Sequence, residues 1–183
     1  MGTTGSGKTT LAGQLARHLD VPHIELDALY WGPQWTPAPS AVFRERVQQA
    51  VDEDTWVADG NYRAVRDILW PRAEMIVWLD YRLRLILWRL LQRTGQRLIT
   101  RETLCGTNQE RLWSQFTRDS LFVWALKTYR RRRRDYLGLF QQPDYAHVHK
   151  VHLRTPRETE AWLQSFIAES AVRDTESGFS GPL

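Results

Sequence analysis

Residues 2–10 read GTTGSGKTT and follow the spacing G-x-x-x-x-G-K-[ST]. In this pattern the backbone N–H groups form a concave nest for phosphate oxygens, and the positive end of a helix lies behind the nest. Leucine recurs every fourth residue in the stretch that follows, at Leu11, Leu15 and Leu19, which predicts an amphipathic helix over residues 10–19. Together the two features predict a phosphate-binding loop, or P-loop, that leads into a helix.

The motif assigns a role to each of its residues. Lys8 is expected to reach the β- and γ-phosphates of ATP, and the hydroxyl of Thr9 is expected to bind Mg²⁺. ATP and Mg²⁺ are therefore the predicted cofactors. The predicted nucleotide-binding residues are Gly2, Thr3, Thr4, Gly5, Ser6, Gly7, Lys8, Thr9 and Thr10.

The rest of the chain alternates apolar runs with helical patterns. Strands are predicted over residues 23–26, 55–58, 75–79 and 147–153. Helices are predicted over residues 41–51, 82–93, 112–136 and 156–168. This alternation predicts an α/β fold with three layers, in which a parallel sheet lies between helices.

The start of the chain departs from that pattern. A P-loop joins a strand to a helix, but only Met1 precedes the motif here. We therefore expect the first, central strand to be missing from the chain as given, which would leave an unpaired slot in the sheet and a poorly stable fold. We also expect one domain over residues 1–169 and a disordered tail over residues 170–183.

Composition and charge exclude several classes of protein. Hydrophobic residues are 42% and charged residues 25% of the 183, which is typical of globular chains. The single cysteine, Cys105, cannot form an internal disulfide, and charges interrupt the most apolar stretch, so a soluble cytoplasmic protein without a membrane span is expected. The net charge is +4, but residues 82–134 hold 14 basic and 3 acidic side chains. This excess of arginine favours an anionic ligand.

Two carboxylates follow predicted strands. Asp59 lies where a Walker-B-type carboxylate holds magnesium through water, although Asp-Gly is also a common turn pair. Asp27 lies where open α/β sheets bind their ligands, so it is a candidate to accept a proton from an attacking hydroxyl; the alternative is an N-cap. Trp31 and Trp35 flank this region, where they either pack in the core or stack on a flat substrate.

Arginines of the middle third form two groups. One group shares a single helical face and consists of Arg82, Arg89, Arg93 and Arg97. We predict that Arg89 and Arg93 stabilise the charge on a transferring phosphoryl group, and the alternative is that the four form a solvated basic face. The run Arg130 to Arg134 surrounds a helix, so it either contributes one arginine to a site on a solvated helix or contacts nucleic acid.

The ordered set of motifs resembles the adenylate kinase-like branch of the P-loop kinases. More closely, the chain is similar to the small bacterial proteins labelled DNA topology modulation proteins, or adenylate kinase-related kinases. The resemblance covers about residues 2–165. Its motifs are GTTGSGKTTLA, HIELDALYW with the later Trp35, WVADGNY, VWLD followed by the arginine helix, GTNQE, and the arginine-rich helix that ends in Tyr136.

This resemblance implies five parallel strands, an acceptor-binding insertion over about residues 28–54 and a lid over about residues 94–111. It implies that Arg89 and Arg93 lead into the lid and that residues 154–156 lie over the adenine. The chain lacks the threonine and arginine pattern with which adenylate kinases hold AMP, so AMP specificity is not implied. In placing an aspartate after the second strand, the chain is similar to shikimate and gluconate kinases, which phosphorylate hydroxyls.

The sequence therefore predicts ATP- and Mg²⁺-dependent phosphoryl transfer to a small molecule or nucleotide. The predicted catalytic residues are Lys8, Asp27, Arg89 and Arg93, and the predicted metal ligands are Thr9 and Asp59. The alternative is a nucleotide-binding regulatory protein with slow ATP hydrolysis, which contacts nucleic acid through its arginine-rich middle third.

Overall fold

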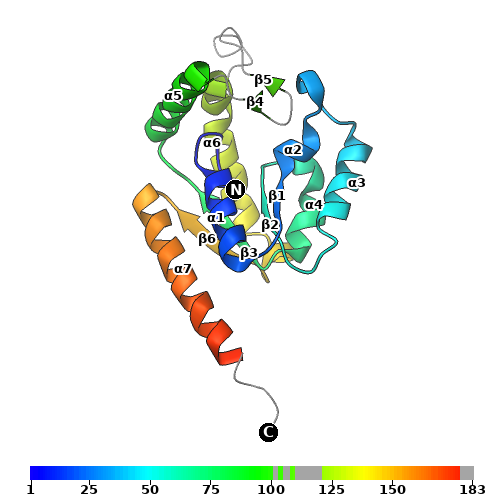
Figure 1. Cartoon of the computed structure of the whole chain (residues 1–183), viewed down its shortest axis with the longest axis vertical. Helices are drawn as coiled ribbons and strands as arrows, with labels where there is room; N and C mark the ends of the chain where they lie inside the picture. Colours follow the sequence, from blue (N-terminus) through cyan, green and yellow to red (C-terminus); the bar gives the residue numbers. More distant parts are fainter. Residues whose placement is uncertain (101–102, 105–107, 110–120, 178–183) are drawn as a thin grey trace.

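The computed structural model describes residues 1–100, 103–104, 108–109 and 121–177, with side chains for residues 1–92 and 125–171. Within these ranges the chain is a mixed α/β fold (Figure 1). The strands are β1 (His23–Glu25), β2 (Val57–Asp59), β3 (Met75–Leu79), β4 (Thr103–Leu104), β5 (Asn108–Gln109) and β6 (His149–Leu153). None of the described helices combines the length and the apolar character that crossing a membrane requires.

Helices occur between and after the strands. The α-helices are α1 (Lys8–Leu19), α2 (Leu26–Tyr30), α3 (Ser40–Ala50), α4 (Arg66–Leu69), α5 (Leu83–Thr100), α6 (Leu121–Phe140) and α7 (Pro156–Ser177). The short 3-10 helices are η1 (Pro33–Trp35), η2 (Arg63–Val65), η3 (Trp70–Arg72) and η5 (Pro143–Tyr145).

The long strands pair in parallel, as the alternation of elements predicts. β1 pairs with β2, which places Glu25 opposite Asp59, and β3 pairs with β6, which places Leu79 opposite Leu153. The short strands β4 and β5 form an antiparallel pair that the sequence did not predict. Parallel pairing is thus confirmed for β1–β2 and β3–β6.

The first two residues lie at the end of β3. The Met1 amine donates to the carbonyl of Val77 at 2.6 Å, and the Leu79 N–H donates to the carbonyl of Met1 at 2.9 Å. On its other side Gly2 is bonded to Asn61, just after β2. Among the described residues, β2 and β3 belong to separate sheets and this segment connects their ends. A single five-stranded, three-layer sheet with a missing central strand stays a prediction.

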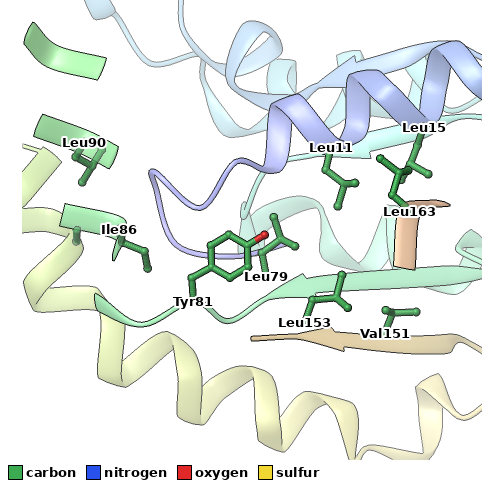
Figure 2. Close-up of a cluster of buried hydrophobic side chains, with 10 residues drawn as sticks. Leu11, Leu15, Leu79, Tyr81, Ile86, Leu90, Val151, Leu153 and Leu163 are labelled. Atoms are coloured by element: carbon green, nitrogen blue, oxygen red, sulfur yellow. The ribbon is translucent and has the colours of Figure 1, made fainter. Parts of the chain in front are cut away.

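Two hydrophobic clusters support these sheets. The first lies around β3 and β6, where α1, α5 and α7 contribute buried side chains (Figure 2). On the opposite face of β3, Trp78 packs against Tyr136 and Phe140 of α6, so helices cover both faces of the β3–β6 pair. The second cluster lies around β1, where α3 and α4 bury Phe43, Val47 and Leu69. Figure 1 shows α2, α3 and α4 gathered on the β1–β2 side of the molecule.

Some boundaries differ from the prediction. The sequence predicts a strand through Leu26, but β1 ends at Glu25 and α2 begins at Leu26. Leu26 is buried and Tyr30 partly buried, four positions apart, which is helical spacing. α7 continues to Ser177, beyond the predicted end at residue 168 and into the predicted tail. Residues 178–183, and most of the predicted lid after residue 100, lie outside the described residues.

Candidate functional site

The P-loop curves into the start of α1. The Ser6 N–H donates to the carbonyl of Thr3 at 3.1 Å, and Gly7 caps the helix with φ 92° and ψ 21°. This left-handed conformation suits glycine, and a Cβ at position 7 would also lie 3.3 Å from the Arg89 guanidinium. Figure 2 shows the loop before α1 passing next to Leu79 at the end of β3. The structure therefore brings the predicted nucleotide-binding residues together at one helix N-terminus.

Lys8 and Asp59 lie at the same end of the molecule. The Lys8 ammonium donates to the carbonyl of Thr3 at 3.3 Å. The pKa of the Met1 amine is lowered to about 5, mainly by burial and then by the positive charge of Lys8, while the negative charge of Asp59 opposes the decrease. Both charges therefore act on one point beside the P-loop.

Asp59 fits a cation-binding role. It is the last residue of β2 and is 7% exposed, yet its Oδ2 atom has no hydrogen-bond partner among the described residues. A buried carboxylate oxygen without a partner is costly unless a cation or an ordered water satisfies it. This orphan oxygen is the observation that makes the chain compatible with a bound magnesium ion.

The metal would need few protein ligands. Within the described residues, no three or more His, Cys, Asp or Glu side chains lie close enough to hold a metal ion. Mg²⁺ usually takes one or two carboxylates and completes its shell with phosphate oxygens and water. Asp59, together with the exposed Thr9 at the start of α1, fits this pattern when ATP supplies the phosphates.

A cleft of about 350 Å³ opens beside the P-loop. Arg89 of α5 reaches its wall: its Nη1 donates to the carbonyl of Ser6 at 3.1 Å, and its guanidinium lies 5.2 Å from the centroid of the Tyr81 ring. The predicted position of Arg89 beside the phosphate loop is thus seen, whereas the side chain of Arg93 lies outside the described residues. The cleft is lined by Gly5, Ser6, Gly7, Thr10, Leu11, Gln14, Leu79, Tyr81, Arg89, Pro156, Thr159, Glu160 and Leu163.

The far wall of the cleft is the start of α7. Glu158 accepts the Arg154 N–H at 2.7 Å, and the Glu158 N–H donates to the Thr155 hydroxyl at 3.1 Å, which together cap the helix. The bond from the Arg154 N–H is the main reason that the pKa of Glu158 is lowered. Thr159 also hydrogen-bonds to the Tyr81 hydroxyl at 2.6 Å. These bonds fix the start of α7, whose Pro156 and Thr159 line the same cleft as the predicted nucleotide-binding residues Gly5 to Gly7.

Asp27 is bonded to Tyr62, a residue of the turn after β2. It is the second residue of α2 and does not cap that helix, whose N-cap residue is Glu25. The Tyr62 hydroxyl donates to Asp27 Oδ1 at 2.6 Å, and Oδ2 of Asp27 makes no hydrogen bond within the described residues. Burial, and then this bond, raise the pKa of Tyr62, so Tyr62 remains a proton donor to the carboxylate. Asp27 is exposed and keeps one oxygen available to a ligand.

Two residues of the site were not predicted. Asn61 accepts the Gly2 N–H at 3.2 Å and donates to the Gly2 carbonyl, so its side-chain amide mimics a strand partner. Tyr62 orients Asp27 as described above. Both lie in the motif WVADGNY, and their place directly after a predicted strand is the signal that could have indicated them.

One arginine of the basic run on α6, Arg133, has a partner within the fold. Arg133 donates to Asp80 Oδ2 at 3.0 Å, and His152 bonds the same oxygen at 2.9 Å. Asp80 is buried at the end of β3, and the His152 ring stacks on Trp78 with centroids 4.1 Å apart. This cluster connects β3, β6 and α6, so Arg133 contributes to the packing of the fold.

Comparison with protein-family models and comparison with curated proteins each find no match to this chain. Among solved structures, the chain is similar to a gluconokinase from Sinorhizobium meliloti 1021. The two share 20% sequence identity over 94% of each chain, with a TM-score of 0.49. At this level the likeness does not decide a reaction, so the proposed function depends on the residues of this chain.

Proposed function

We propose that the protein transfers the γ-phosphoryl group of ATP to a small acceptor. The observation that carries the proposal is that one cleft is lined both by Gly5, Ser6 and Gly7 of the P-loop and by Pro156 and Thr159 of α7. A helix N-terminus with a nest of N–H groups binds phosphates, and an adjoining cleft of this size accommodates a nucleoside. ATP supplies the phosphoryl group, and Mg²⁺ neutralises charge on the phosphates when bound.

The residues of the chain divide this work among them. Lys8 and the N–H groups of the P-loop bind the phosphates, and Asp59 with Thr9 would hold the metal. Arg89 is already hydrogen-bonded to the Ser6 carbonyl, so its guanidinium is close to where charge develops on the transferred group. Positioning and charge neutralisation are sufficient for this reaction, because phosphoryl transfer needs little covalent chemistry from the protein.

Asp27 is the proposed proton acceptor. A new bond forms between the acceptor oxygen and the γ-phosphorus, the bond from that phosphorus to ADP breaks, and the hydroxyl proton passes to Asp27. The bond from Tyr62 to Oδ1 leaves Oδ2 to accept this proton. An exposed carboxylate with one oxygen fixed and the other available has the geometry that a general base requires.

The test is acceptor-dependent ATP consumption, with the product identified by phosphorus NMR. The panel contains nucleoside monophosphates, nucleosides and hydroxylated metabolites, each with Mg²⁺. Lys8→Ala should abolish turnover, whereas Lys127→Ala, which removes an exposed lysine from α6, should leave it unchanged. A phosphorylated acceptor that disappears in Lys8→Ala supports the proposal. ATP binding without stimulation by any acceptor would contradict it and favour the nucleotide-binding regulator.

A further inference from the structure

Four aromatic rings form a row that starts beside Asp27. Tyr62 donates to the Asp27 carboxylate at 2.6 Å, and its ring centroid lies 4.7 Å from that of Tyr30. The Tyr30 ring is 4.8 Å from Trp31, and the Trp31 ring is 5.9 Å from Trp35. We call these four side chains the aromatic row. It extends from the proposed proton acceptor to the surface of the molecule.

The row is supported from behind. Phe43 of α3 is fully buried, and its ring lies 5.1 Å from Tyr30 and 5.0 Å from Tyr62, both in edge contacts. Tyr30, Trp31 and Tyr62 are only half-buried, so each ring keeps part of its surface outside the core. The inner rings are thus fixed in place and still accessible.

The outer end of the row stands on a strained turn. Gln34 and Trp35 both adopt left-handed backbone conformations, with φ of 57° and 58°. Hydrogen bonds close the turn, from the Gly32 N–H to the Thr36 carbonyl at 2.8 Å and from the Ala38 N–H to the Tyr30 carbonyl at 2.8 Å. The Trp35 side chain on this turn is 38% exposed. Strained non-glycine residues of this kind gather at ligand clamps.

We propose that the aromatic row binds a planar ring of the phosphoryl acceptor, whose hydroxyl lies at Asp27. The inference rests on the proposed function, since it identifies the acceptor class of the same site. Stacking on Tyr and Trp is available to any flat π-system, including every nucleobase, but not to an open-chain polyol. The acceptor is therefore an aromatic or heterocyclic compound that carries a hydroxyl, such as a nucleoside.

The test measures nucleoside binding directly and separately from turnover. Adenosine, guanosine, cytidine and thymidine are titrated into the full chain by calorimetry, with gluconate as the polyol comparison. Trp35→Ala should weaken binding of the best nucleoside about ten-fold, because one stacked ring is lost. Trp35→Phe should restore most of the affinity. Trp88→Ala is the matched control, since Trp88 is an exposed tryptophan (54%) on α5 outside the row.

The outcomes separate the two proposals. Nucleoside binding that falls in Trp35→Ala supports the aromatic row, even where no phosphorylated product forms and the proposed function fails. Phosphorylation of gluconate alone, at the same rate in Trp35→Ala, overturns the aromatic row and leaves the proposed function intact. Absence of binding by all four nucleosides also overturns the row, because base stacking tolerates differences between bases.

Discussion

Replacing Gly60 by alanine should destabilise the protein strongly, because this position has neither the conformation nor the space for a side chain. Gly60 has φ of 137°, and a Cβ there would lie 2.6 Å from Leu26 Cβ and 2.9 Å from Leu26 Cδ1. Leu26 is only 2% exposed and begins α2, so it cannot move away without disturbing the second core cluster. The turn that carries Asp59 and Asn61 would be displaced with it.

The magnitude follows from two separate effects. An alanine in a glycine-only backbone region costs about 2 kcal/mol, and overpacking against a buried leucine costs about 2 kcal/mol more. The free energy of unfolding should therefore fall by about 4 kcal/mol, which lowers the thermal midpoint by about 12 °C for a chain of this size.

The matched control is Gly138→Ala in α6. An added Cβ at position 138 meets no atom within 4 Å, and the residue is exposed. Alanine should stabilise the helix there by about 0.5–1 kcal/mol. Urea unfolding followed by circular dichroism measures both variants. A loss below about 1 kcal/mol in Gly60→Ala would contradict this prediction, since it would equal the effect of an ordinary substitution without strain or overlap.

Substitutions at three further positions, with controls, test other parts of the structure. Arg89→Ala should lower kcat of acceptor-dependent turnover about 100-fold with little change in the unfolding midpoint. Arg89→Lys should not restore kcat, because lysine lacks the planar guanidinium. Unchanged steady-state kinetics in Arg89→Ala would contradict the role of Arg89. Asp80→Asn should lower the free energy of unfolding by about 2 kcal/mol, since its charge-assisted bonds to Arg133 and His152 weaken. Asp67→Asn, at the exposed pair with Arg44, should leave the urea midpoint unchanged, and equal effects of the two substitutions would disprove this account. The pKa of Glu158 lies below its usual 4.5 in the folded protein, so the unfolded chain binds more protons in this pH range. The contribution of Glu158 to the free energy of unfolding is therefore complete above about pH 4.5 and is lost as the pH falls through the lowered pKa. Glu158→Gln should remove this part of the acid sensitivity when urea midpoints are compared between about pH 5 and pH 3, and an unchanged pH profile would contradict it.

The local parts of the fold could be predicted from the sequence. The P-loop and α1 follow from the glycine spacing and the leucine repeat, and β3 follows from a short apolar run. The alternation of elements predicts parallel pairing, but not which distant side chains contact each other, because nothing local encodes those contacts. Asn61 bonds Gly2 across 59 positions, and Tyr62 bonds Asp27 across 35. α2 escaped prediction because five residues are too few to show a helical period.

The last residue of β2 and the three residues that follow it explain why the candidate site is a unit. Asp59 presents an unpartnered carboxylate oxygen beside the P-loop, and Gly60 lets the chain pass against Leu26. Asn61 then bonds both backbone groups of Gly2, and Tyr62 bonds Asp27. Four consecutive residues therefore connect the candidate metal ligand, the phosphate loop and the proposed proton acceptor.

Because the turn after β2 connects these residues, its displacement would affect two functions together. A displacement of the turn would move Asp59, Asn61 and Tyr62 together, so phosphate binding and the orientation of Asp27 would be lost at once. The side chains of Asn61 and Tyr62 act separately, since each bonds a different segment of the chain. Loss of the Asn61 amide would loosen the phosphate loop, and loss of the Tyr62 hydroxyl would leave Asp27 free to rotate. The turn after β2 thus sets the distance between the two halves of the proposed reaction.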